Sequence, residues 1–358
     1  PPLHPAICVA TEVGMVPDFL NSFFSKFRKL WSLSVKEILF RIRAVYTGKK
    51  EQMQYRYGYK PTYRERAGAG TPDTQFFLSR TSCSKKKQMF LAHGYMDRII
   101  QEAEQVLSGK VNLLGVEMVV PSGKNWSRDP VTGKMWPFLF YTNVRFHPSV
   151  KHLDIKFVWE INRHQYLIPL GKAFWFTRYK KYAKAVFAII TDWIAANPYH
   201  TGVNWSSSLE NAVRLFSWIW ALTFCKDSAY YKEQIQPIKK SIFEQTHHIH
   251  NHLSIYSSPY NHLVGEASAL YLVGTLFPEF HKADVWRKTG WDILENAIET
   301  QFHPDGITVE QAFFYHHFTL GFYLTCLLVH KKNQGQVPEP FLDRIQKAIE
   351  ISVYLEMP

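Results

Sequence analysis

Two short segments of the sequence carry polar side chains of the kinds that move protons. The first is Asn261-His262 with Glu266 four residues further on, and the second is Glu310 with Tyr315 five residues later. An amide can donate hydrogen bonds to a developing negative charge, whereas an imidazole, a phenol or a carboxyl group can transfer a proton. If the two segments are the starts of neighbouring helices, these groups meet at one rim of a helical barrel.

Each of these residues also has an ordinary structural explanation. Asn261 could serve only as a helix N-cap, because a short polar side chain there accepts a hydrogen bond from the first helical turn. His262 and Glu266 are spaced to form a hydrogen-bonded pair on one helix face. Tyr315 is one of nineteen tyrosines. Most of these pack in a core or stack, so the case for Tyr315 depends on its neighbours.

Two further pairs combine a carboxylate with an arginine. Glu210 and Arg214 are four residues apart, and Glu160 and Arg163 are three apart. At these spacings an ion pair within one helix is expected. The same arginines could hold an acidic ligand, since a guanidinium can pair with Glu and still face a second carboxylate.

Four histidines stand close together at His247, His248, His250 and His252. On a helix His248 and His252 could bind a metal ion at four-residue spacing, but a third ligand and an HExxH context are missing. We therefore expect no metal. No glycine-rich phosphate-binding motif and no nucleic-acid module is present, so we expect no cofactor and no nucleic-acid partner.

The composition favours an anionic partner. The 358 residues carry a formal net charge of +12, with 46% hydrophobic and 16% aromatic residues. Such a balance suits nucleic acid, a membrane surface or an acidic polysaccharide, although it also fits a basic protein with scattered charge. The run 313–329 is apolar, but His316 and His317 within it indicate a buried core helix, so we expect no integral membrane segment.

Helical patterns dominate from about Asp154 onward, separated by short turns with proline or glycine. Three of them, 207–224, 261–275 and 310–330, keep polar residues only near their starts and are otherwise apolar, as buried helices are. Repeated helices of this kind predict a mainly α fold, an incomplete (α/α) toroid of helical hairpins with a polar cavity at one end. The expected helices are 165–176, 180–196, 207–224, 229–252, 261–275, 283–302, 310–330 and 339–355.

The first part of the chain is less regular. We expect two domains: an N-terminal helix and irregular region over 1–90, and the helical toroid over 91–358, with a small irregular and β part near its start. The expected elements before Asp154 are helices over 35–46 and 95–107, a loop over 48–90, and strands over 111–120 and 136–141, which could pair.

A series of short motifs runs in order through about residues 110–330. Taken in sequence, they resemble the heparinase II/III-type polysaccharide lyases, which include alginate lyases and heparan sulfate lyases. The motifs are Asp154-Ile155-Lys156, Trp159-Glu160, Arg163, Asn197-Pro198, Gly202, Asn204-Trp205, Leu209-Glu210, Arg214, Asn261-His262, Glu266, Phe277-Pro278-Glu279, Trp286, Gly290, Asp305-Gly306, Glu310-Gln311 and Tyr315.

The resemblance implies a toroid followed by an antiparallel β-sandwich, which we expect this sequence not to include, and a periplasmic or secreted location. It implies that Asn261 and His262 neutralise a substrate carboxylate and that Tyr315 is catalytic, while a further His or Tyr comes from the sandwich; this piece could therefore be inactive. The residues expected to bind the substrate are Glu160, Arg163, Trp205, Glu210, Arg214, Glu266 and Glu310.

Three functions remain open at this stage. The first, implied by the resemblance, is β-elimination on a glycosaminoglycan, alginate or another glycan containing uronic acid. The second is glycoside hydrolysis on a similar toroid, with two of Glu210, Glu266 and Glu310 as acid and base. The third is glycan binding without catalysis.

Overall fold

The computed structural model describes residues 33–66, 76, 94–333 and 335–356. The chain divides into two compact units, residues 1–47 and 48–358, and the expected division after residue 90 stays a prediction. Helix α2 (Val35–Arg56) runs well past the expected end at residue 46. The expected loop over 48–90 therefore begins with a helical stretch, and most of its remainder, 67–75 and 77–90, lies outside the described residues.

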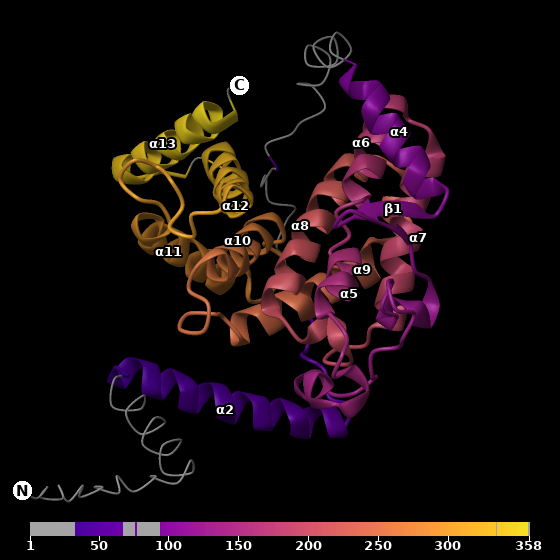
Figure 1. Ribbon diagram of the computed structural model, residues 1–358, viewed down its shortest axis with the longest axis horizontal. Helices are drawn as coiled ribbons and strands as arrows, with labels where there is room; N and C mark the ends of the chain where they lie inside the picture. Colours follow the sequence, from indigo (N-terminus) through magenta and orange to yellow (C-terminus); the bar gives the residue numbers. More distant parts are fainter. Residues whose placement is uncertain (1–32, 67–75, 77–93, 334, 357–358) are drawn as a thin grey trace, which may run out of the picture. The chain divides into compact units, whose positions relative to one another are not determined.

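The larger unit is built almost wholly from helices, which confirms the mainly α fold class (Figure 1). Neighbouring helices pack in pairs, α6 with α8, α7 with α9, and α10 with α11 and α12, as the hairpins of an incomplete (α/α) toroid. The helices are α4 (Tyr95–Leu107), α5 (Ile155–Asn162), α6 (Leu167–Thr177), α7 (Lys180–Ala196), α8 (Ser208–Cys225), α9 (Ala229–Asn251), α10 (Asn261–Leu276), α11 (Ala283–Gln301), α12 (Phe313–Lys332) and α13 (Glu339–Glu356).

Three helices were expected to be buried on all sides, and the structure confirms this for two of them, α8 and α10. Helix α8 is buried along most of its length, and in α10 every residue except His262 and Leu276 is buried. Helix α12 differs, because its first three residues are exposed and it begins at Phe313 rather than at residue 310. Gln311, just before it, has a left-handed backbone (φ 51°), which cannot continue a right-handed helix.

Helices α10 and α11 touch through their backbones at two glycines. A Cβ added at Gly274 would lie 2.4 Å from the backbone nitrogen of Arg287, and one added at Gly290 would lie 2.4 Å from the carbonyl oxygen of Ala267. No larger residue fits at either position without moving a helix. Helix α10, which begins with Asn261 and His262, is therefore held in a fixed position against α11.

The expected strand over 111–120 is a hairpin. Strands β1 (Lys110–Leu113) and β2 (Val116–Val119) pair antiparallel across Leu114 and Gly115, whose φ angles of 52° and 74° suit a tight hairpin turn. The expected pairing of 136–141 with this strand is wrong, since the bridges near that segment join Met135 to Arg128 and Phe140 to Thr201.

Residues 123–153, here called the capping segment, form three short 3₁₀ helices: η2 (Gly123–Ser127), η3 (Tyr141–Phe146) and η4 (Pro148–Val150). The backbone N–H of Tyr141 donates to the carbonyl of His200 (3.0 Å), and Val144 is fully buried in a small apolar cluster. The capping segment is thus attached firmly to the helical unit. Within the described ranges, no helix has both the length and the apolar character needed to cross a membrane.

Candidate active site

A cavity of about 360 Å³ opens beside the starts of α8 and α10. Its wall combines an arginine, three histidines, a tyrosine and a glutamate with six serines. The lining residues are Tyr141, Arg145, Ser206, Ser207, Ser208, His248, His252, Ser254, Ser257, Ser258, His262 and Glu266.

Asn261 and Glu310 meet, as expected of the two polar segments. The Asn261 Nδ2 donates to Glu310 Oε1 (2.7 Å) and Oε2 (2.9 Å), and the Asn261 backbone N–H donates to Oε2 (3.2 Å). Asn261 is the first residue of α10 and Tyr260 is the N-cap, so the N-cap explanation of Asn261 is wrong. Glu310 instead accepts the hydrogen bonds and fixes the amide at the helix start.

Arg163 forms a two-carboxylate ion pair that the sequence predicted only in part. It pairs with Glu160 as expected, through Nη1 to Oε2 (2.7 Å). It also holds Glu210 with two bonds, Nε to Oε2 (2.8 Å) and Nη2 to Oε1 (2.9 Å). Burial acts against its charge, but the hydrogen bonds and charge of Glu210, with the charge of Glu160, raise the pKa of Arg163 overall.

The expected ion pair between Glu210 and Arg214 is therefore wrong. Arg214 is fully buried, where its guanidinium donates to Gln245 Oε1 (2.8 Å), Asn211 Oδ1 (2.6 Å) and two backbone carbonyls and lies over the ring of Trp193. Burial lowers its pKa to about 9. Trp205 is also buried, with 1% of its surface exposed. Neither side chain reaches the cavity, so both support the site from behind.

The expected pair between His262 and Glu266 is also replaced. Glu266 is fully buried and accepts from the backbone N–H (2.7 Å) and the hydroxyl (2.7 Å) of Ser254. Burial raises its pKa to about 8, so this carboxyl group holds a proton at neutral pH. Burial also lowers the pKa of His262, although the charges of Glu210 and Glu310 act in the opposite direction, and so favours its neutral imidazole.

Tyr315 stands apart from this hydrogen-bonded group. It is the third residue of α12 and 43% exposed, and its ring contacts Phe314. Its link to the site is electrostatic, through the charge of Arg163. His262 is likewise within the fields of Arg163, Glu210 and Glu310. The structure thus places Asn261, His262 and the Arg163 ion pair in one electrostatic group, with Tyr315 at its edge.

The sequence missed a second network beneath the cavity. His252 Nε2 contacts Glu51 Oε2 (2.9 Å) and the Tyr141 hydroxyl (3.2 Å), and His248 Nδ1 contacts His200 Nε2 (3.0 Å). Although burial acts in the opposite direction, the hydrogen bond and charge of His252 lower the pKa of Glu51 to about 2. These histidines bond to protein groups, and Glu51 lies too far away in the sequence for any spacing to have revealed it.

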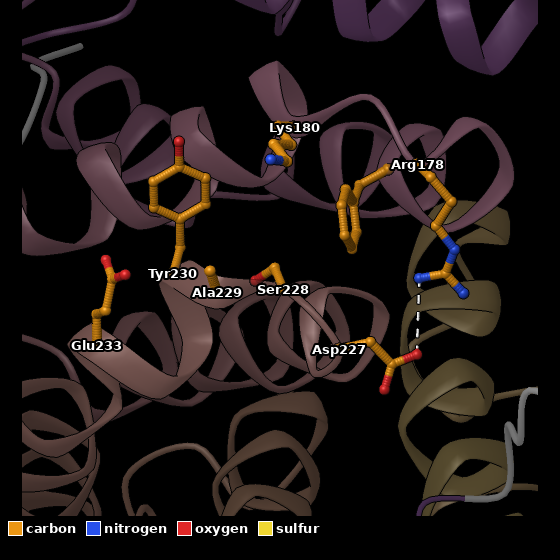
Figure 2. Close-up of a pocket in the computed structure, with 8 residues that line it drawn as sticks. Arg178, Lys180, Asp227, Ser228, Ala229, Tyr230 and Glu233 are labelled. Atoms are coloured by element: carbon orange, nitrogen blue, oxygen red, sulfur yellow. Dashed lines mark ion pairs between the residues drawn. The ribbon is translucent and has the colours of Figure 1, made fainter.

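A second cavity of about 360 Å³ lies between the turn joining α6 to α7 and the start of α9. Figure 2 shows Arg178 and Asp227 pointing toward one another across its edge, 3.6 Å apart, with Lys180, Tyr230 and Glu233 further along. None of the residues expected to act on a substrate lines this cavity.

Comparison with known families places the chain. Residues 79–358 match the Heparinase II/III N-terminus family, which is most of the sequence, and the chain belongs to that family. It is 27% identical over 240 residues to a heparin-sulfate lyase of Bacteroides thetaiotaomicron, covering 65% of this chain and 34% of that protein. It is 29% identical over 227 residues to a heparin-sulfate lyase of Bacteroides stercoris, covering 57% and 34%. The chain thus spans about a third of the length of these curated relatives.

Solved structures share the fold. The heparan sulfate lyase of Pedobacter heparinus aligns with a TM-score of 0.54 at 20% identity, covering 73% of this chain and 38% of that one. An alginate lyase from Bacteroides ovatus aligns with a TM-score of 0.51 at 15% identity, covering 79% and 84%. At these identities the likeness concerns the fold, and it confirms the predicted (α/α) toroid class.

Proposed function

We propose that this protein is a polysaccharide lyase that cleaves an anionic glycan containing uronic acid by β-elimination. The observation that carries the proposal is the Asn261 amide, held by Glu310 at the start of α10, directly beside His262, which lines an open cavity. Membership of the heparinase II/III family and the names of the relatives support the same chemistry.

The reaction removes the C5 proton of the uronate and breaks the bond between C4 and the linking oxygen. The electron pair from C5–H forms the new double bond, and the pair from C4–O leaves with the oxygen, which takes a proton. Negative charge builds on the uronate carboxylate before the oxygen departs. In this scheme the Asn261 side-chain amide, which Glu310 orients, donates to that charge, and His262 contributes beside it.

Two side chains near the start of α10 and of α12, His262 and Tyr315, are candidates for the proton transfers. Tyr315 is 43% exposed, enough to contact a polymer, and its charge interaction with Arg163 places it near the site. The neutral imidazole of His262 can accept a proton at pH 7. We assign the proton transfers at C5 and at the leaving oxygen to Tyr315, with His262 and Asn261 positioning the carboxylate.

The carboxyl groups considered for hydrolysis are all engaged. Glu210 is held by two hydrogen bonds from Arg163, Glu310 binds Asn261, and Glu266 is buried against Ser254. A hydrolase needs one carboxyl group free to protonate the leaving oxygen and another free to activate water or attack. The arrangement therefore favours elimination.

The test is incubation of the full chain with heparan sulfate and with alginate while absorbance in the low ultraviolet is followed. Elimination creates an unsaturated product that absorbs there, and we expect the signal with at least one polymer. New reducing ends without that absorbance would indicate hydrolysis. Binding without either signal would indicate a glycan-binding protein and would refute the lyase assignment.

A further inference from the structure

Arg145 is the single arginine or lysine in the described lining of the cavity that holds His262. It lies on η3 of the capping segment and is exposed to solvent. Its guanidinium carbon is 4.8 Å from the ring centroid of Trp159, over the face of the indole. Stacking of this kind orients the guanidinium plane and leaves its N–H edge open for a planar or tetrahedral anion.

The other arginines near the site are already neutralised or enclosed. Arg163 is held by Glu160 and Glu210, and Arg214 is buried among amide and carbonyl oxygens. Arg145 feels the charge of Glu210, but both oxygens of that carboxylate are taken by Arg163. Within the described part of the chain, Arg145 is therefore the cation of this cavity that forms no hydrogen bond or ion pair with a carboxylate.

The backbone that carries Arg145 is well anchored. Tyr141, at the start of η3, donates its backbone N–H to His200 (3.0 Å) and its hydroxyl to Glu51 Oε2 (2.9 Å). Val144, next to Arg145, is fully buried. A charged group on a fixed backbone binds a ligand with a smaller entropy loss than one on a free loop.

Hydroxyl groups complete the wall. Six of the twelve lining residues are serines. The hydroxyls of Ser206, Ser208 and Ser254 donate to protein groups, whereas those of Ser207, Ser257 and Ser258 have no such acceptor among the described residues. Neutral hydroxyl donors bind the oxygens of carboxylates and sulfo groups without adding charge. We infer that Arg145 is a specificity-determining residue, which binds an anionic substituent of the glycan, a carboxylate or a sulfo group, in this serine-lined cavity beside His262. The inference rests on the proposed function, because it names the feature of the glycan that the same site selects.

The test measures binding by calorimetry for the full chain and three variants. Arg145→Gln removes the charge, and Arg145→Lys keeps the charge but loses the planar fork. Arg98→Gln removes an exposed arginine of α4 that does not line the cavity. The ligands are two oligosaccharides of equal length, one from heparan sulfate and one from the same uronate backbone without sulfation. Circular dichroism checks that each variant is folded.

We expect Arg145→Gln to weaken binding by about 10-fold, as when one charged hydrogen-bond donor is lost, with a smaller loss for Arg145→Lys and none for Arg98→Gln. The salt dependence of binding should also flatten in Arg145→Gln alone. A loss confined to the sulfated ligand identifies a sulfo group, whereas an equal loss with both identifies the carboxylate.

Two results would overturn the inference, and they are distinguishable. If the unmodified protein binds the glycans and Arg145→Gln binds them as tightly as Arg98→Gln does, Arg145 has no recognition role and the lyase proposal is untouched. If the unmodified protein neither binds nor cleaves any uronate polymer, the proposed function fails and the role of Arg145 fails with it.

Discussion

At the scale of single residues, the hydrogen bond from Asn261 to Glu310 joins segments 49 positions apart and decides how the amide is presented. An asparagine at a helix start normally turns back to cap its own helix. Here Tyr260 takes the N-cap position, and the amide is free to be oriented by a carboxylate from another segment. This orientation is what the proposed stabilisation of the uronate carboxylate requires.

We predict that Tyr315→Phe reduces turnover by at least about 100-fold, the usual contribution of a proton-transferring side chain, while leaving the thermal unfolding curve unchanged. The side chain is 43% exposed, so the loss of its hydroxyl costs little stability. Tyr179→Phe, at an exposed tyrosine away from the cavity, is the matched control. Full activity in Tyr315→Phe would refute the assignment.

A second prediction at this scale concerns the buried carboxyl group of Glu266. Its pKa is about 8 in the folded state, above the ordinary value of 4.5. The native protein therefore holds a proton that the unfolded chain releases, and its contribution to stability is present below pH 4.5 and lost as the pH rises toward 8. Glu266→Gln mimics the neutral acid and should flatten the decline in urea midpoint between pH 5 and 9. An unchanged decline would contradict this.

The sequence pointed to most of the polar residues of the candidate site and to some of their partners, such as Glu160 for Arg163, but not to others. Asn261, His262 and Glu310 could be predicted because they stand near the starts of otherwise apolar helical runs. It could not be predicted that Glu210 pairs with Arg163 rather than with Arg214, because this pairing depends on how α5 packs against α8. Arg145 gave no signal either, because it stands in an irregular segment whose position only tertiary contacts define.

At the scale of elements, the helices were the most predictable feature. Apolar periodicity and breakers placed α4 and α7 at their observed bounds, and α8 to α11 within one residue at each end. The start of α12 was predicted three residues too early. The chain leaves the helical conformation at Gln311, and a glutamine gives no sequence signal for a left-handed backbone as a glycine would. The hairpin was missed because its two strands have only four residues each. Together with Leu114 and Gly115 between them, they form one apolar stretch, which was predicted as a single strand.

The glycine contact between α10 and α11 gives a prediction at this scale. Gly290→Ala should lower the free energy of unfolding by on the order of 1–3 kcal/mol or more, since its Cβ would meet the backbone of α10 at 2.4 Å. Gly321→Ala is the control, because a Cβ there meets nothing within 4 Å in the middle of α12. That change should stabilise by about 0.5–1 kcal/mol. Urea denaturation measures both, and equal effects would contradict the packing argument.

At the scale of the whole molecule, the net charge of +12 contrasts with a site whose charges nearly balance. Arg163 is offset by Glu160 and Glu210, and the buried Glu266 is neutral at pH 7. The overall field can attract a polyanion from a distance, while recognition at short range depends on a few placed donors.

Acid unfolding of the larger unit should show the contribution of Glu51. Its pKa is about 2 in the folded state against an ordinary 4.5, so its stabilising effect is present above pH 4.5 and is lost as the pH falls toward 2. In Glu51→Gln we expect lower stability at pH 7 and a shallower loss across that acid range. Circular dichroism during acid titration provides the measurement, and parallel curves for the two proteins would rule out this role.

The close packing of α10 against α11 limits how a protein of this fold can evolve specificity for a different polymer. Mutations that reshape the helical scaffold would displace the amide and imidazole together, and so would abolish chemistry before altering selectivity. The capping segment (residues 123–153) contacts that scaffold but is separate from α10, and it contributes Arg145 to the cavity. Directed evolution toward a new polymer should therefore diversify this short stretch and leave the helices as they are.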